Sequence, residues 1–133
     1  MITWLKAGEQ HQHKNGGGWV ANTATVEDSV HIGANAWVYG NARVSGNARV
    51  SGDAWVSGNV WVLGDAQMSG SARVFGNAQV YGDARVFGNA QVSGNARVYG
   101  NARVYGDAQV YGDAWVETPL FIQGTKHGVS NSS

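Results

Sequence analysis

Residues 40–57 read GNARVSGNARVSGDAWVS, which is one six-residue unit written three times with small changes. The same unit can be followed from Gly16 to Glu117 without an insertion or deletion, which makes seventeen consecutive units. Self-similarity at a fixed short period is typical of solenoids, in which each repeat packs on its neighbours. We therefore expect one elongated, repetitive domain over residues 16–117.

Each position of the unit has a distinct physical role. The fifth position is valine in every unit except at Ile32 and Met68, and the third is alanine except at Gly18, Val30 and Val60. Apolar residues two apart, with a polar or aromatic residue between them, follow the period of a β-strand. The first two positions are mostly Gly followed by Asn or Asp, which tolerate the left-handed backbone of a tight turn. Each unit is therefore predicted to be a short strand and a corner.

Every unit carries the same two inward residues, at its third and fifth positions. This is expected if the units form equivalent walls of one coil, and it argues against a series of antiparallel hairpins. Three walls make a triangular coil of eighteen residues, so the repeat region predicts an all-β parallel β-helix of about 5.7 coils and roughly 27 Å. Residues 1–15 are then an N-terminal leader or cap, and residues 118–133 an exit segment and tail. Ile2, Trp4 and Leu5 are expected to cover the first coil, because natural solenoids protect their open edges. Pro119 is expected to end the ladder of strands.

The order of residues within the unit resembles that of the hexapeptide-repeat (trimeric LpxA-like) family. An aliphatic residue, two turn residues and a small residue follow one another, as in Val44, Gly46-Asn47 and Ala48. The resemblance covers about three quarters of the chain and implies a left-handed β-helix that is often a homotrimer. The GNARV units, with residues 15–21 and 118–124, look most like bacteriophage and prophage members that are labelled transferases. Those members continue further, so the polar ending at 130–133 fits either a short member or a truncated chain.

Composition narrows the function classes. Nine basic and nine acidic side chains cancel, so net charge does not indicate duplex nucleic acid or an anionic membrane as a partner. The chain has no cysteine, which excludes disulfides and thiolate metal sites. Neither a signal peptide nor an apolar stretch of roughly 18 residues is visible, and we expect a soluble cytoplasmic protein.

One column of outward side chains is unusual. Residues eighteen apart should lie above one another, which places Trp19, Trp37 and Trp55 in a stripe on one wall. Stacking of identical side chains stabilises coils, and this is one interpretation of the stripe. Burial in a threefold subunit interface is an equally good one, because contiguous aromatic surface is rarely left exposed to water. A platform for a carbohydrate or other ligand is the third.

Other columns carry charge or amides. Arg85 and Arg103 share a wall with Phe87 and Tyr105, a combination that suits a nucleotide or another small anionic ligand. A solvated arginine ladder is the favoured interpretation, because arginine recurs throughout the repeat. Amide ladders should also run along one corner; they would join Asn41, Asn59, Asn77 and Asn95. Asp65 and Asp83 should be neighbours at a corner, as turn residues or as ligands of a cation.

The resemblance also raises the question of catalysis, because the family includes carbonic anhydrases and acyltransferases. The anhydrases hold zinc with three histidines, whereas this chain has only His31 within its coils, so no metal site is expected. His11 and His13 are assigned to a solvated leader. An acyltransferase would use His31 or His127 as the base and acyl-CoA as the cofactor. No loop interrupts the units, which leaves little to exclude water from a reaction.

Together these observations favour a non-enzymatic structural or binding module of phage or prophage origin, without a cofactor. We expect it to assemble as a homotrimer through the wall that carries Trp19, Trp37 and Trp55. An acyltransferase-like enzyme is the main alternative. A binder of a small anionic ligand at the Arg85, Phe87, Arg103 and Tyr105 patch is the second.

Overall fold

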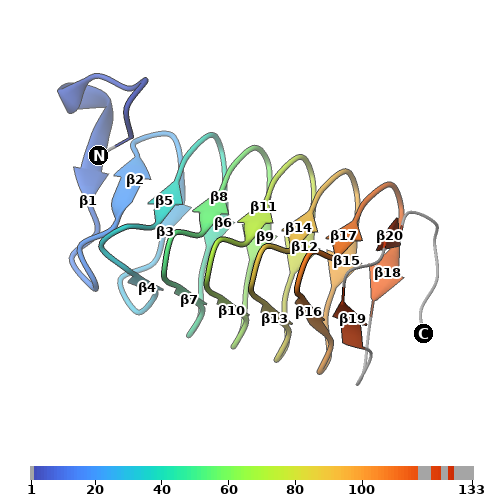
Figure 1. The fold of residues 1–133 in the computed structure, drawn as a ribbon. Coiled ribbons are helices and arrows are strands. Elements are labelled where there is room, and N and C mark those ends of the chain that lie inside the picture. The colour runs from blue at the N-terminus through green and yellow to red at the C-terminus, as the bar shows by residue number, and fades with distance from the viewer. Residues whose placement is uncertain (1, 117–120, 124–125, 128–133) are drawn as a thin grey trace.

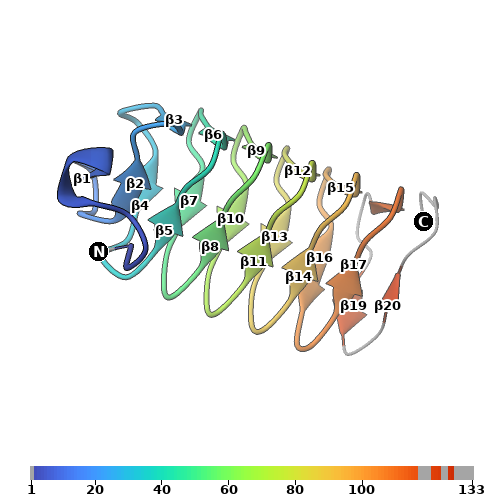
Figure 2. The ribbon, with the colours of Figure 1, turned by 90° about the horizontal axis from the view of Figure 1, so that it is seen from above.

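The chain winds into a straight rod with three walls, and successive coils follow one another along the rod from β2 to β20 (Figures 1 and 2). The structure is a computed structural model that describes residues 2–116, 121–123 and 126–127. Each regular coil contributes one short strand to each of three sheets. The predicted all-β parallel solenoid is confirmed.

The three sheets are called A, B and C. Sheet A has eight strands: β1 (Gln10–Gln12), β2 (Trp19–Ala21), β5 (Trp37–Val38), β8 (Trp55–Val56), β11 (Arg73–Val74), β14 (Gln91–Val92), β17 (Gln109–Val110) and β20 (Lys126–His127). Sheet B has six: β3 (Thr25–Val26), β6 (Arg43–Val44), β9 (Trp61–Val62), β12 (Gln79–Val80), β15 (Arg97–Val98) and β18 (Trp115–Val116). Sheet C has six: β4 (His31–Ile32), β7 (Arg49–Val50), β10 (Gln67–Met68), β13 (Arg85–Val86), β16 (Arg103–Tyr105) and β19 (Phe121–Gln123).

The coil length is eighteen residues throughout the repeat region. Strands from successive coils pair in parallel with partners eighteen positions apart, as Trp37 pairs with Trp55 and Arg73 with Gln91. Because this register is constant, every outward side chain lies beside the residues one coil before and one coil after it. The columns predicted from the sequence are therefore real neighbours.

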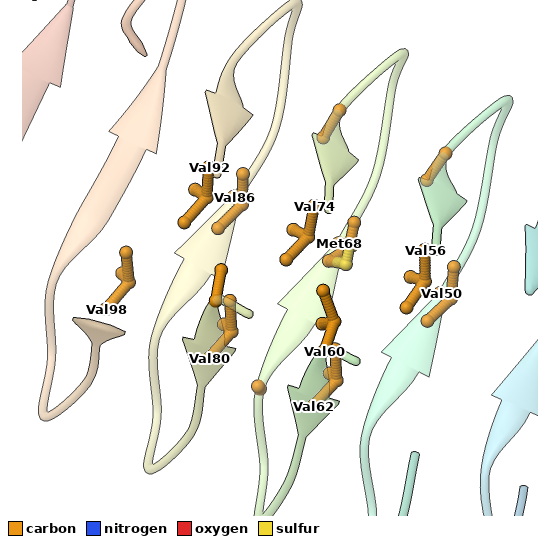
Figure 3. Packing of buried hydrophobic residues seen from close by; sticks show 14 of the residues in the cluster. Val50, Val56, Val60, Val62, Met68, Val74, Val80, Val86, Val92 and Val98 are labelled. Carbon is orange, nitrogen blue, oxygen red and sulfur yellow. The ribbon is translucent and has the colours of Figure 1, made fainter. Parts of the chain in front are cut away.

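A narrow stack of valine and alanine side chains fills the interior (Figure 3). Val62 and Val80 are fully buried, as are Ala66 and Ala84, and Met68 is the one long side chain among the inward residues of the regular units. Burying each valine contributes about 1.5 kcal/mol or more before chain entropy is counted. Since the walls converge on this stack, the interior has no room for a ligand, and any binding must take place on the outside.

Glycine is required at the corners for two independent reasons, which Gly76 illustrates. Its φ is +75°, in the left-handed region that side chains disfavour. A Cβ atom on Gly76 would also lie 2.9 Å from the backbone nitrogen of Gly94 in the next coil. The corners stack this closely because they are hydrogen-bonded, with the amide of Asn77 donating to the carbonyl of Gly94 at 2.7 Å.

The leader folds over the first coil. A short 3-10 helix, η1 (Ala7–Glu9), precedes β1, which pairs antiparallel with β2 and so covers the outer edge of sheet A. Ile2 is fully buried. The assignment of His13 to a solvated leader is wrong, because His13 is buried and its Nε2 atom lies 2.7 Å from the carbonyl oxygen of Val30. A carbonyl only accepts hydrogen bonds, so the imidazole donates this one.

The ladder continues beyond the last regular unit. Strand β19 pairs with β16 and keeps the eighteen-residue register, since Phe121 pairs with Arg103, and β20 pairs with β17. The expectation that Pro119 ends the ladder is therefore wrong, because the chain resumes the same register two residues after the proline. Pro119 itself and the polar ending at 130–133 lie outside the described residues.

We predict that Gly76→Ala destabilises the protein more than Gly17→Ala does. Gly17 also has a positive φ, +80°, but a Cβ there would meet nothing within 4 Å. Gly17→Ala should therefore cost only the left-handed strain of about 1–2 kcal/mol, whereas Gly76→Ala adds a clash with the next coil. Thermal melts followed by circular dichroism measure the difference, and equal melting temperatures would contradict the stacking argument.

Candidate binding surfaces

The tryptophan column lies on the outer face of sheet A. The backbones of Trp19, Trp37 and Trp55 are successive partners in this sheet. The indoles of Trp37 and Trp55 stack, with ring centroids 5.4 Å apart and planes 3° from parallel. Among the described residues no ring contact joins Trp19 to Trp37. Stacking between coils therefore involves two of the three predicted indoles.

A fourth indole comes from the leader. Trp4 packs edge-on against this wall, with its ring centroid 5.5 Å from that of Trp37, 4.9 Å from that of Tyr39 and 6.4 Å from that of Trp55. Trp4 was expected to cover the first coil, but it lies on the side of the rod and is 55% exposed. We call Trp4, Trp37, Tyr39 and Trp55 the aromatic cluster. Tyr39 was not predicted as part of this surface, although its position two residues after Trp37 indicates the same outward face.

A buried glutamine holds Trp4 against the wall. The Oε1 atom of Gln10 accepts a hydrogen bond from the amide of Ile2 at 2.8 Å. Its Nε2 atom donates to the carbonyls of Ile2 at 3.0 Å and Leu5 at 3.1 Å. Trp4 lies between the two clamped residues, so its backbone position is determined by this amide.

Arg73 extends the cluster by one coil. Its Cζ atom lies 4.3 Å from the centroid of the Trp55 ring, which is a cation–π contact. Beside this contact is an open hollow, and its lining residues are Tyr39, Trp55, Ser57, Arg73, Val74 and Phe75. A second hollow on the same side of the rod is lined by Gln91, Ser93, Gln109 and Tyr111.

The basic patch proposed from the sequence lies on sheet C. Arg85 and Arg103 are partners in neighbouring strands, and the rings of Phe87 and Tyr105 stack with their centroids 5.1 Å apart. The structure thus brings all four residues to one wall. However, each ring has one face covered by the other, and Asp65 and Asp83 line the same hollow as the two arginines. This mixture of charges weakens the preference of the hollow for an anion.

The candidate catalytic histidines are far apart. His31 lies in β4, the first strand of sheet C, whereas His127 lies in β20, the last strand of sheet A. The side chain of His127 is outside the described part of the structure. The Nδ1 atom of His31 is 3.3 Å from Oδ1 of Asn15, in an open hollow that Ser29, Asn47 and Arg49 also line. The two histidines therefore cannot share one active site within a single chain.

Amide side chains connect coils at two corners. Asn59 donates from Nδ2 to Oδ1 of Asn77 at 3.3 Å, which confirms part of the predicted ladder. Asn95 donates to the carboxylate of Asp113 at 3.3 Å, at the end of the same column. At another corner, Asn89 donates to Asp107 at 3.4 Å. These bonds give a structural role to six of the recurring turn residues, Asn59, Asn77, Asn89, Asn95, Asp107 and Asp113.

Within residues 2–116, 121–123 and 126–127, one ion pair is present, between Lys14 of the leader and Asp28. The Nζ and Oδ2 atoms are 2.8 Å apart, and the hydrogen bond and charge of Lys14 lower the pKa of the Asp28 carboxyl. A lowered pKa means that the pair stabilises the fold above the usual aspartate pKa and loses this effect as the pH falls. Both side chains are largely exposed, so the effect is small.

Two further properties describe the surface. No group of three or more histidine, aspartate or glutamate side chains suited to a metal ion occurs within the described residues. The same part of the chain contains no helix that is both long and apolar enough to cross a lipid bilayer.

Comparison with known families supports the repeat. The model of the YdcK Beta solenoid repeat matches residues 36–52, 42–58, 48–64, 78–94, 90–106 and 96–112. The matches start at multiples of six residues from one another, the same period that the sequence shows. No curated protein and no solved structure matches the chain. Sequence repeat, family model and three-sheet topology agree, and the chain is a β-solenoid repeat protein.

We predict that Gln10→Leu releases the leader and its Trp4 side chain without unfolding the coils. The substitution leaves the amide of Ile2 and the carbonyl of Leu5 without their partner, at a cost of about 1–3 kcal/mol for each buried polar group. The carbonyl of Ile2 keeps the hydrogen bond from the amide of Leu5. Amide hydrogen exchange should become faster across residues 2–9 and stay unchanged in β5 to β17. Gln12→Leu is the matched control, since Gln12 is exposed and makes one bond, to the carbonyl of Gly17. Unchanged exchange in Gln10→Leu would contradict the clamp.

Proposed function

We propose that this protein is a non-enzymatic structural and binding module that assembles as a homotrimer through the wall of sheet A. The aromatic cluster of Trp4, Trp37, Tyr39 and Trp55 is the observation that supports this most directly. The proposal extends to a cytoplasmic location and a phage or prophage origin. The origin is supported by the resemblance of the repeat units to hexapeptide-repeat proteins of phages and prophages.

The cluster has the properties of an association surface. Trp37 and Trp55 are only half-buried, and Trp4 adds an indole that is 55% exposed, so the leader widens the apolar surface. Contiguous exposed aromatic surface on a soluble protein typically marks an interaction site. Tryptophan, tyrosine and arginine dominate the energetics of protein interfaces, and Arg73 lies directly beside the cluster. Sheet A also offers a regular wall against which a second wall can pack.

The arrangement of the other polar groups favours binding over catalysis. Hollows on the walls, such as those beside His31 and beside Arg85, are open spaces between the outward side chains of neighbouring coils. An acyl transfer needs an enclosed site that orients two substrates and excludes water. The uninterrupted coils provide flat walls instead, and flat walls suit association between proteins.

We predict that Trp37→Arg weakens assembly and leaves the coils folded. Arginine occupies the same outward position at Arg43 and Arg73, so the solenoid accepts it there. In the proposed interface, however, it replaces the ring that contacts Trp4 and Trp55. Light scattering should show a mass of three 14.0 kDa chains for the unaltered protein and a lower mass for the variant. Circular dichroism should remain that of a β-solenoid.

Trp61→Arg is the matched control for this experiment. Trp61 has the same position in its unit and is 42% exposed, but it lies on sheet B. If sheet A forms the interface, Trp61→Arg keeps the mass of the unaltered protein. A monomeric unaltered protein would refute the assembly, and an equal loss of mass in both variants would refute the choice of wall.

A further inference from the structure

We propose that the corner beside sheet A at Ser57 binds a planar aromatic ring that carries an anionic group. The ring would lie between the side chains of Tyr39 and Phe75, with its anionic group on Arg73. The site shares Tyr39 and Trp55 with the association surface proposed above, and it lies away from the Arg85 and Arg103 patch that the sequence suggested.

The sixth position of the unit shows how rings fit on this solenoid. Tyr81 and Tyr99 occupy this position in successive coils, and their rings stack with centroids 5.0 Å apart and planes 6° from parallel. Phe87 and Tyr105 do the same on another wall, at 5.1 Å and 5°. One coil therefore advances a side chain at this position by the separation of two offset-stacked aromatic rings.

On the sheet A side, every second ring of such a stack is absent. The sixth position there carries, in order of coils, Tyr39, Ser57, Phe75, Ser93 and Tyr111. Backbone hydrogen bonds place them in successive coils, since the amides of Ser57 and Phe75 donate to Val74 and Val92 one coil further on. Tyr39 and Phe75 are thus two coils apart, which is about 10 Å. A serine side chain fills little of this space, and the open hollow lined by Tyr39, Ser57 and Phe75 lies there.

A planar ring inserted over Ser57 would lie about 5 Å from each neighbouring ring, as the protein's own stacked rings do. Both contacts would be ring to ring, stacked or edge to face, and a flat aromatic ring makes such contacts better than a puckered saturated ring does. Phe75 is 38% exposed, so it can accept a ring. Tyr39 is held by edge-on contacts with Trp4, at 4.9 Å, and with Trp55, at 6.4 Å, and it is therefore already in place before a ligand binds.

Arg73 makes this hollow suited to an anion. Its guanidinium lines the hollow and lies over the Trp55 ring, and it has no carboxylate partner, because the ion pair within the described residues is Lys14 with Asp28. A guanidinium with free donors binds carboxylate or phosphate oxygens in a bidentate manner. The comparable hollow at Ser93 is lined by Gln91 and Gln109, which are uncharged. The two hollows thus differ in the arginine and in their rings, since Tyr111 is the one ring that lines the hollow at Ser93, whereas Tyr39, Trp55 and Phe75 line the hollow at Ser57.

The test uses the full-length protein and 2-naphthoate as the probe, with binding measured by titration calorimetry. Cyclohexanecarboxylate is the puckered control and 2-naphthalenemethanol the uncharged control. We expect 2-naphthoate to bind more tightly than either control. Ser57→Tyr should abolish binding, because the new ring completes the stack between Tyr39 and Phe75. Arg73→Gln should weaken 2-naphthoate several-fold and leave 2-naphthalenemethanol unchanged.

Ser93→Tyr is the matched control, since it fills the neighbouring uncharged hollow in the same way and should leave 2-naphthoate binding intact. Melting curves establish folding, and Ser57→Tyr is expected to melt no earlier than the unaltered protein because tyrosine stacks at this position in Tyr81 and Tyr99. The proposal is overturned if the unaltered protein does not bind 2-naphthoate, if folded Ser57→Tyr still binds it, or if Ser93→Tyr loses binding equally. Light scattering of the same samples records assembly, so loss of the proposed oligomer and loss of this site are distinguished.

Discussion

Backbone hydrogen bonds between coils are the constraint on which the rest of this structure depends. They join strand to strand at an eighteen-residue register, and they also join corner to corner, as in the bond from Asn77 to Gly94. Glycine at the corners allows this close approach, because a Cβ there would meet the backbone of the next coil. A constant rise per coil follows, so each position of the repeat becomes a column of neighbouring side chains.

The same constraint moves function to the outside of the rod. Three converging walls leave an interior that valine and alanine fill, as Figure 3 shows, so a ligand has no place among them. The outward columns then differ only in which side chain each coil places in the column. Trp37 and Trp55 lie in adjacent coils and stack, whereas Ser57 leaves a space between Tyr39 and Phe75. The outward residues of each coil therefore determine the chemistry of the surface at that coil.

The leader departs from the repeat, and it changes the most aromatic wall. It supplies an antiparallel strand at the edge of sheet A and places Trp4 on Trp37 and Tyr39 through the clamp made by Gln10. The proposed association surface and the proposed ring site both involve Tyr39, and Trp4 orders it. A non-repetitive segment thus prepares a surface that the repeat alone would leave less well organised.

Much of this fold follows from the sequence alone, because the six-residue period of the sequence determines which residues become neighbours. The coil length, the Val and Ala interior and the pairing of Trp37 with Trp55 all follow from counting in sixes and eighteens. Only the tertiary structure shows that His13 is buried, that Trp4 lies on the side of the rod and that the register resumes after Pro119. These features lie in segments outside the regular units, where contacts join residues at irregular separations and depend on packing that no period encodes.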